Sequence, residues 1–94
     1  MSDEPIELPI NGILDLHTFH PRDVKDLVPN YLRACRERGI LDVRIIHGKG
    51  TGVLRETVHG VLSRLAFVDS YRLSGDSSGW GATLVRLFPL ERAV

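Results

Sequence analysis

The sequence has a single cysteine, no long apolar run and no net charge, and the first two of these shortages each exclude a class of protein. Because Cys35 is the only cysteine among the 94 residues, the chain cannot close an intrachain disulfide or build a zinc site from cysteines. No apolar run approaches the roughly 20 residues of a membrane span, and the N-terminus lacks the basic start and apolar core of a signal peptide. We therefore expect a soluble cytoplasmic protein with no membrane partner.

The lack of net charge conceals an uneven distribution of charged side chains. Lys plus Arg and Asp plus Glu number 12 each, so the total argues neither for nor against a nucleic-acid partner. Residues 1–30 carry six acidic and two basic side chains, whereas residues 33–64 carry seven basic and three acidic ones. A basic middle suits a polyanion such as DNA or RNA, although a solvated helix surface would give a similar count.

Length and composition indicate one domain with short ends. Residues 1–12 contain Pro5 and Pro9 and predict an extended lead-in, residues 13–88 predict the domain, and residues 89–94 a C-terminal tail. No repeat or second domain is present in these 94 residues, so we expect a stand-alone, single-domain protein.

Hydrophobic periodicity predicts two helices and four strands. The expected elements, in chain order, are a strand over 13–17, a helix from Pro21 to Gly39, a strand over 43–46, a helix from Val53, and strands over 68–73 and 81–88. The first helix presents an apolar stripe of Val24, Leu27, Val28, Tyr31, Leu32 and Cys35. The second is expected to bury Leu54, Val58, Val61, Leu62 and Leu65.

The element order is therefore β-α-β-α-β-β. Strands separated by one helix should run parallel with right-handed crossovers, and the last two strands, joined by a short turn, should be antiparallel. Two helices can cover one face of a four-stranded sheet but not both. We predict an α/β (α+β-like) two-layer sandwich, with a mixed four-stranded sheet and both helices on one face.

The uncovered face of this sheet is expected to be basic. A charged head group seldom lies unpaired beneath helices, so Arg44, Arg72 and Arg86 are assigned to the open face, with Asp15 and His17 at one end of it. An exposed basic sheet is a common nucleic-acid platform. The alternative is an ordinary polar face in contact with solvent.

A glycine-rich loop follows the second predicted strand. The sequence His47-Gly48-Lys49-Gly50-Thr51-Gly52 leads directly into the second helix, and we expect Thr51 to be its N-cap. Glycine leaves backbone N–H groups uncovered, the first turn of a helix has N–H groups without intrahelical partners, and Lys49 adds a cation. These features favour an anion such as phosphate. The alternative is that the three glycines only turn the chain.

Three segments of the sequence resemble the small MutS-related (Smr) domain family. Leu14-Asp15-Leu16-His17 is similar to the family's Leu-Asp-x-His motif, and residues 47–52 match its His-Gly-x-Gly-x-Gly signature at every fixed position. Gly79-Trp80-Gly81-Ala82-Thr83 resembles the glycine-rich entry to the last strand of the family. The segments occur in the family's order, and the resemblance covers about residues 13–88.

This resemblance implies the β-α-β-α-β-β fold, nucleic-acid binding and, as in several members, a DNA-nicking or RNA-cleaving endonuclease activity. By motif, it implies functional roles for Asp15 and His17 and for the loop residues His47, Gly48, Lys49, Gly50 and Gly52. The chain departs from the family at Thr18, where the family usually has glycine after the motif's histidine. We expect Thr18 to stiffen that loop and to keep its backbone farther from a phosphate.

The two motif histidines are candidate proton-transfer groups. His17 and His47 end neighbouring strands, so we expect their imidazoles to converge with Lys49 on a phosphodiester, with Asp15 orienting His17 or helping to hold an ion. A two-metal site needs several carboxylates, and Asp15 has only Glu56 as a neighbouring candidate. We therefore expect cleavage without a metal, or with one weakly bound Mg²⁺ or Mn²⁺, and RNA as the easier substrate.

Several alternatives stay open from the sequence. His47 could instead bond a loop carbonyl, Asp15 could cap a neighbouring loop, and the domain could bind DNA or RNA without cutting it. One function is excluded, because Gly48-Lys49-Gly50-Thr51 lacks the spacing of a P-loop. No nucleoside triphosphate is expected as a partner.

Overall fold

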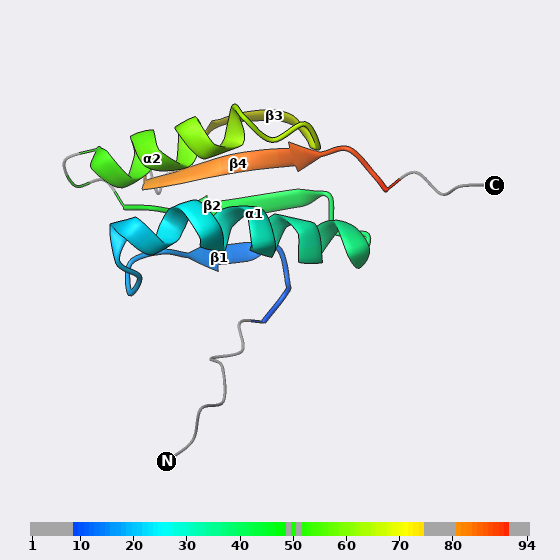
Figure 1. Ribbon diagram of the computed structural model, residues 1–94, viewed down its shortest axis with the longest axis horizontal. Helices are drawn as coiled ribbons and strands as arrows, with labels where there is room; N and C mark the ends of the chain where they lie inside the picture. The colour runs from blue at the N-terminus through cyan, green and yellow to red at the C-terminus, as the bar shows by residue number, and fades with distance from the viewer. Residues whose placement is uncertain (1–8, 49, 51, 75–80, 91–94) are drawn as a thin grey trace, which may run out of the picture.

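The computed structural model describes residues 9–48, 50, 52–74 and 81–90. It contains the predicted order of elements: β1 (Ile13–Asp15), α1 (Pro21–Glu37), β2 (Asp42–Ile46), α2 (Val53–Leu62), β3 (Val68–Leu73) and β4 (Ala82–Leu87). Both helices lie over the same face of the sheet (Figure 1). The two-layer sandwich predicted from the sequence is therefore confirmed.

The four strands form one mixed sheet in the order β1-β2-β4-β3. β1 and β2 are parallel, whereas β4 is antiparallel to both of its neighbours, β2 and β3. β2 and β3 thus share a direction, as their separation by one helix predicts, but β4 lies between them. This order makes β1 and β3 the edge strands and places β2 and β4 in the centre.

The core lies between the sheet and the helices, and it follows the alternation of side chains along the strands. The buried strand residues are Leu14, Val43, Ile45, Val85 and Leu87, and the helices contribute Val24, Val28, Tyr31, Leu32, Cys35, Val58, Val61 and Leu62. Each buried aliphatic side chain contributes about 1.5–3 kcal/mol. Packing of α1 and α2 on one face is therefore the main stabilising interaction of the fold.

Three strands differ from the sequence prediction by one or two residues: β1 ends at Asp15 and not at residue 17, β2 begins at Asp42 and not at Val43, and β4 spans Ala82–Leu87 and not 81–88. β1 ends at Asp15, two residues early, because the Asp15 carboxylate accepts a bond of 3.0 Å from the backbone N–H of His17 and turns the chain. β4 begins at Ala82, because the Gly81 carbonyl accepts bonds from both His47 N (2.9 Å) and Gly48 N (2.8 Å).

The start of α2 corrects a further expectation. The N-cap is Gly52, not Thr51, and Gly52 has a left-handed backbone with φ of +90° and no side chain to bond the first turn. Thr51 itself lies outside the described residues, as do Lys49, Trp80, the turn over 75–79 and the outer parts of both termini. Leu65 lies beyond the end of α2 at Leu62 but still packs against the core.

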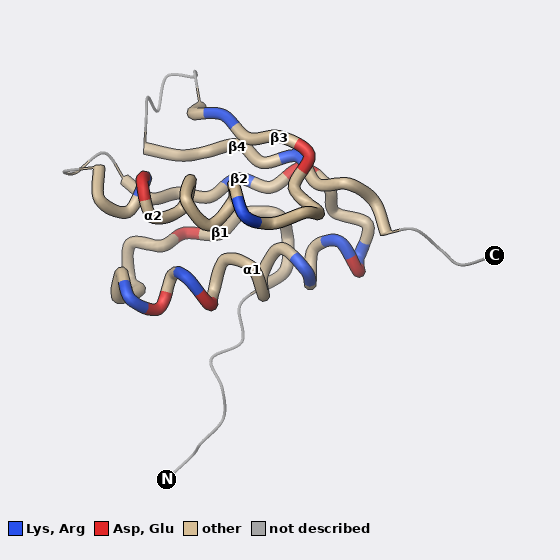
Figure 2. The backbone as a smooth tube through the Cα atoms, turned by 45° about the horizontal axis from the view of Figure 1, so that its top comes forward, with Lys and Arg blue, Asp and Glu red and all other residues tan. Residues whose placement is uncertain are grey.

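The surface of α1 carries both signs of charge along its length (Figure 2). Its basic residues alternate with acidic ones, as in Arg22-Asp23 and Lys25-Asp26. Within the basic segment 33–64, Arg33 and Arg36 lie on α1 whereas Arg44 lies on the face of the sheet away from the helices, so its basic residues do not form one continuous patch. Within the residues that the structure describes, neither helix has the length and apolarity of a membrane span.

Candidate active site

The side chains of Asp15 and His17 form a hydrogen-bonded pair at the carboxyl end of β1. Asp15 Oδ1 lies 2.8 Å from Nδ1 of His17, and the two side chains are 46% and 72% exposed. An ionised carboxylate only accepts hydrogen bonds, so Nδ1 carries the proton and Nε2 of the neutral ring is left with a free lone pair. The arrangement presents an oriented proton acceptor to solvent.

The same contacts explain the acidity of Asp15. The hydrogen bond from the His17 side chain, followed by the bond from the His17 backbone N–H, lowers the pKa of Asp15 below its ordinary value of 3.8. Asp15 is therefore ionised at neutral pH and stabilises a positive charge on His17. A carboxylate that fixes the tautomer of a histidine and supports its imidazolium is a recurrent element of acid–base catalysis.

His47, by contrast, is buried, with 5% of its surface exposed. Its Nδ1 lies 3.0 Å from the carbonyl oxygen of Gly48, and its Nε2 lies 2.8 Å from the hydroxyl of Thr83 on β4. Both ring nitrogens are thus engaged within the protein. His47 makes the loop-carbonyl contact that the sequence left open as an alternative to catalysis.

The predicted convergence of the two imidazoles is not observed. Asp15 pairs with Ile46 in the register of β1 and β2, and side chains alternate, so His47 as the next residue points to the helix-covered face. Asp15 follows the buried Leu14 and therefore points away from the core, with His17 beside it. The two strands are neighbours, as expected, but their histidines leave on opposite sides of the sheet.

A hydrogen-bonded chain runs from His47 to α2. Thr83 is fully buried, and its hydroxyl also lies 2.8 Å from Nε2 of His59. The Gly48 carbonyl only accepts, so neutral His47 is protonated at Nδ1 and accepts at Nε2 from the Thr83 hydroxyl. The same hydroxyl then accepts from His59 Nε2–H. The chain of donors is therefore directed from His59 through Thr83 and His47 to the glycine loop.

His59 is held in its neutral form. Burial, then the nearby His47 and Arg55, lower the pKa of His59 below its ordinary value of 6.5. Its ring packs against Tyr71 of β3, with ring centres 5.0 Å apart, and lies 6.3 Å from the ring of His47. His59 thus packs against Tyr71 and also has a polar partner in Thr83.

Arg55 joins the glycine loop, which the sequence did not predict. Gly48, Gly50, Gly52 and Arg55 line a hollow of about 250 Å³ with His47 and the first residues of α2. The Arg55 guanidinium lies so close to Gly52 that a Cβ there would be 2.9 Å from its nitrogen. The sequence did contain one indication of this role, because Arg55 lies in the first helical turn after the last glycine of the loop.

The open face holds the three arginines that the sequence assigned to it. Arg44, Arg72 and Arg86 line a hollow of about 520 Å³ on the side of the sheet away from the helices. Arg86 pairs with Asp42 at 2.6 Å, and Arg44 lies 3.5 Å from the hydroxyl of Ser74. We refer below to this side of the sheet as the open face.

Metal ligands are sparse in the part of the chain that the structure describes. No three side chains of His, Cys, Asp and Glu come together there as a ligand set. Asp15 and His17 would offer a divalent ion one carboxylate and one imidazole, which is the donor set of an ion held partly by substrate phosphates.

The directed chain of donors yields a prediction about histidine tautomers. In ¹⁵N-labelled protein, neutral His47 should be protonated at Nδ1 and neutral His59 at Nε2. Thr83→Val keeps the side-chain shape but removes the shared hydroxyl, so both histidines should become mixtures of tautomers and stability should fall by about 1–3 kcal/mol. Thr83→Ser is the matched control and should retain both tautomers. A wild-type His47 protonated at Nε2 would contradict the assignment.

The lowered pKa of His59 predicts a loss of stability in mild acid. Below its ordinary pKa of 6.5, the unfolded chain binds a proton on this residue more readily than the folded chain. Stability should therefore fall as the pH drops from about 6.5 to the folded-state pKa, and then stop changing on this account. His59→Gln retains a donor for Thr83 and should flatten this dependence in urea unfolding curves. An unchanged slope would show that another group is responsible.

Comparisons with known proteins agree with this fold. A family model described as the Smr domain matches residues 14–88. Endonuclease MutS2 of Thermomicrobium roseum is 36% identical over 75 residues, and endonuclease MutS2 of Clostridium tetani is 41% identical over 79 residues. These regions cover 79% and 83% of this chain but 10% of each relative, so the chain spans about a tenth of the length of the curated relatives it matches.

Two solved structures resemble the chain throughout the domain. The Smr domain of Thermus thermophilus MutS2 has a TM-score of 0.78 and 31% identity, covering 84% of this chain and 100% of that one. YdaL of Escherichia coli, a stand-alone small MutS-related protein, has a TM-score of 0.74 and 25% identity, covering 82% of this chain and 64% of that one. On the family match and on this likeness, the chain belongs to the Smr domain family.

Proposed function

We propose that this domain binds nucleic acid and cleaves its phosphodiester backbone, by nicking DNA or cutting RNA. The observation that carries the proposal is the exposed Asp15–His17 pair, whose geometry leaves Nε2 of an oriented imidazole facing solvent. The MutS2 relatives are named endonucleases, which supports the same chemistry. Asp15 and His17 are the catalytic residues of this proposal.

The reaction uses His17 as a general base. With RNA, Nε2 takes the proton of the 2′-hydroxyl, the 2′-oxygen attacks phosphorus, and the bond from phosphorus to the 5′-oxygen breaks. Asp15 stabilises the imidazolium that forms on His17. The leaving 5′-oxygen is protonated by Lys49 or by solvent. RNA is the easier substrate because its nucleophile is built into the strand.

The phosphate is held by the glycine loop and the start of α2. Lys49, Gly50, Thr51 and Gly52 supply backbone N–H groups, and Lys49 supplies positive charge. Gly48 was predicted to join them, but its backbone N–H donates to the Gly81 carbonyl at 2.8 Å, so in this proposal Gly48 shapes the loop. Gly52 makes no side-chain cap bond to the first turn of α2, and the N-terminus of a helix favours an anion. We add Arg55 to this set, because its guanidinium lies beside Gly52 at the same hollow.

The remaining residues support binding. Arg44, Arg72 and Arg86 on the open face contact the nucleic acid outside the reacting phosphate. His47 was predicted to be catalytic, and in this proposal it acts on the reaction by holding the loop through the Gly48 carbonyl. An Mg²⁺ or Mn²⁺ ion at Asp15 would add positive charge at the phosphate, and no step above depends on it.

A second candidate function is binding without cleavage. The observation that favours it is the burial of His47, which leaves His17 as the one motif histidine whose ring is exposed. A cleavage panel of supercoiled plasmid and structured RNA, with and without Mg²⁺ or Mn²⁺, separates the two functions. Binding with no cleavage under any condition would establish the second.

His17→Ala should slow cleavage by roughly 100-fold or more while leaving binding nearly intact, because it removes a general base. His20→Asn is the matched control, since it removes an exposed histidine but keeps an acceptor for the Arg22 backbone N–H that His20 caps. Cleavage rates and affinities are measured on the same RNA. Equal losses of binding and cleavage in His17→Ala would make His17 a phosphate contact.

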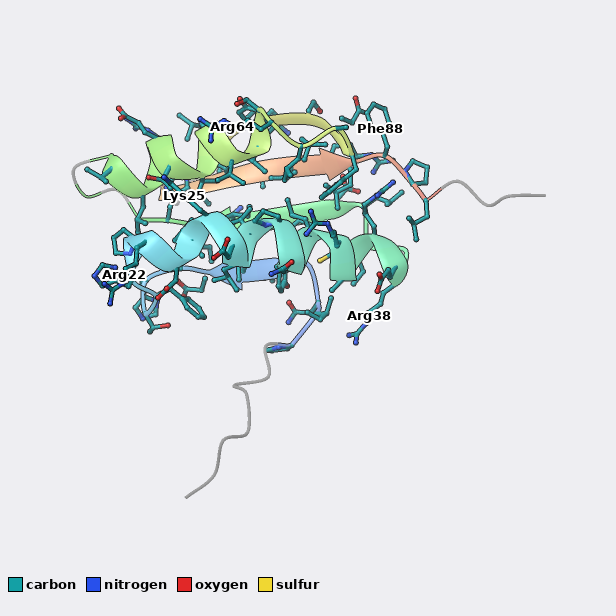
Figure 3. All side chains as sticks on the ribbon, viewed as in Figure 1. Arg22, Lys25, Arg38, Arg64 and Phe88 are labelled. Atoms are coloured by element: carbon teal, nitrogen blue, oxygen red, sulfur yellow. The ribbon has the colours of Figure 1, made fainter. Side chains whose placement is uncertain are left out.

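Arg55→Ala should weaken binding to all nucleic-acid sequences alike. The loss of one phosphate contact lowers the slope of log affinity against log salt concentration by about one unit at most. Lys49→Ala should have the same effect. The control is Arg64→Ala, which removes equal charge just beyond the other end of α2 (Figure 3). An unchanged affinity and slope in Arg55→Ala would place the phosphate elsewhere.

A further inference from the structure

One row of side chains crosses the entire open face. In the register of the sheet, Arg72 of β3 pairs with Leu84 of β4, Leu84 with Arg44 of β2, and Arg44 with Ile13 of β1. Neighbouring strands lie about 4.8 Å apart, so this row spans about 14 Å from one edge strand to the other. We call these four residues the cross-strand row.

The chemistry of the row alternates between cation and aliphatic side chain. Arg72 is exposed and has no hydrogen bond or ion pair with another described residue. Ile13 is 53% exposed and Leu84 is half-buried, so both offer apolar surface on this face. Arg86 lies in the next row, on the side away from the glycine loop. There it forms an ion pair of 2.6 Å with Asp42. Among the described residues, Arg72 is therefore the arginine of the open face whose charge can be offered to a ligand.

The row ends beside the candidate catalytic pair. In the adjacent row, toward the carboxyl end of β1, Ala82 pairs with Ile46 and Ile46 with Asp15. A chain that lies along the cross-strand row and leaves the sheet over β1 thus passes Asp15 and His17. The hollow of about 520 Å³ that the row lines gives such a chain a concave track.

We propose that the cross-strand row binds a single-stranded segment of nucleic acid and leads it to Asp15 and His17. A duplex presents a phosphate surface and requires only cations, whereas a single strand alternates phosphates with unstacked bases. The arginines match the phosphates, and the aliphatic side chains with the planar guanidinium groups match the base faces. The inference rests on the proposed function, for which it names the substrate class.

The test compares single-stranded and blunt duplex RNA of one sequence by fluorescence anisotropy. Arg72→Ala should weaken single-strand binding and lower its salt slope by about 0.7. Leu84→Thr should weaken single-strand binding without changing the salt slope, because it removes apolar surface and no charge. Both variants should weaken duplex binding less than they weaken single-strand binding. Arg64→Ala, on the helix side, is the charge-matched control and should change neither, and circular dichroism melting checks that each variant is folded.

The outcomes separate this inference from the proposed nuclease function. Equal losses for duplex and single strand would overturn it in favour of a phosphate-only surface, and unchanged single-strand binding would overturn it outright. If poly-glutamate displaces the labelled RNA as well as the unlabelled RNA strand does, the partner of the open face is an acidic protein and the inference is wrong. Cleavage of a long single strand should fall in Arg72→Ala together with its binding. Cleavage of a dinucleotide, which is too short to follow the row, should be normal in the Arg64→Ala control and lost in His17→Ala. Normal dinucleotide cleavage in His17→Ala would refute the nuclease proposal instead.

Discussion

The alternation of side chains along β2 is the constraint on which the rest of this structure depends. Val43 and Ile45 point into the core under the helices, and Arg44 between them points to the open face. The same alternation continues to His47, which enters the helix-covered layer. A shift of one residue in this strand would bury Arg44 and expose Ile45, so packing of the core fixes the position of every polar group along it.

This constraint divides the polar groups of the domain into two sets with different environments. Asp15 and His17 are exposed, so their chemistry is directed toward a substrate. His47, Thr83 and His59 are enclosed between β4, β2 and α2, where their hydrogen bonds are satisfied by one another and by the glycine loop. A hydrogen-bonded network of this kind rigidifies its surroundings. The Gly48 end of the glycine loop is therefore held by His47 and Thr83, which are buried, and through them by His59, which is half-buried.

Much of the site followed from local sequence. The Leu-Asp-x-His segment determines the Asp15–His17 pair. An aspartate can accept hydrogen bonds from both the backbone N–H and the side chain of the residue two positions later. The basic open face followed from the same period-two pattern that predicted the strands. The convergence of His17 with His47 was wrong, because adjacency of two strands does not determine which face a side chain takes.

The sequence by itself determined the elements, their order, the face that each strand buries and the turn that joins Asp15 to His17, because these depend on residues close together in the chain. Only the tertiary structure decided that β4 lies between β2 and β3, and this placement brings Thr83 to His47 and to His59, 36 and 24 residues away. It likewise aligned Arg72, Leu84, Arg44 and Ile13 from four strands. Such contacts depend on strand register, which the packing of the whole core sets.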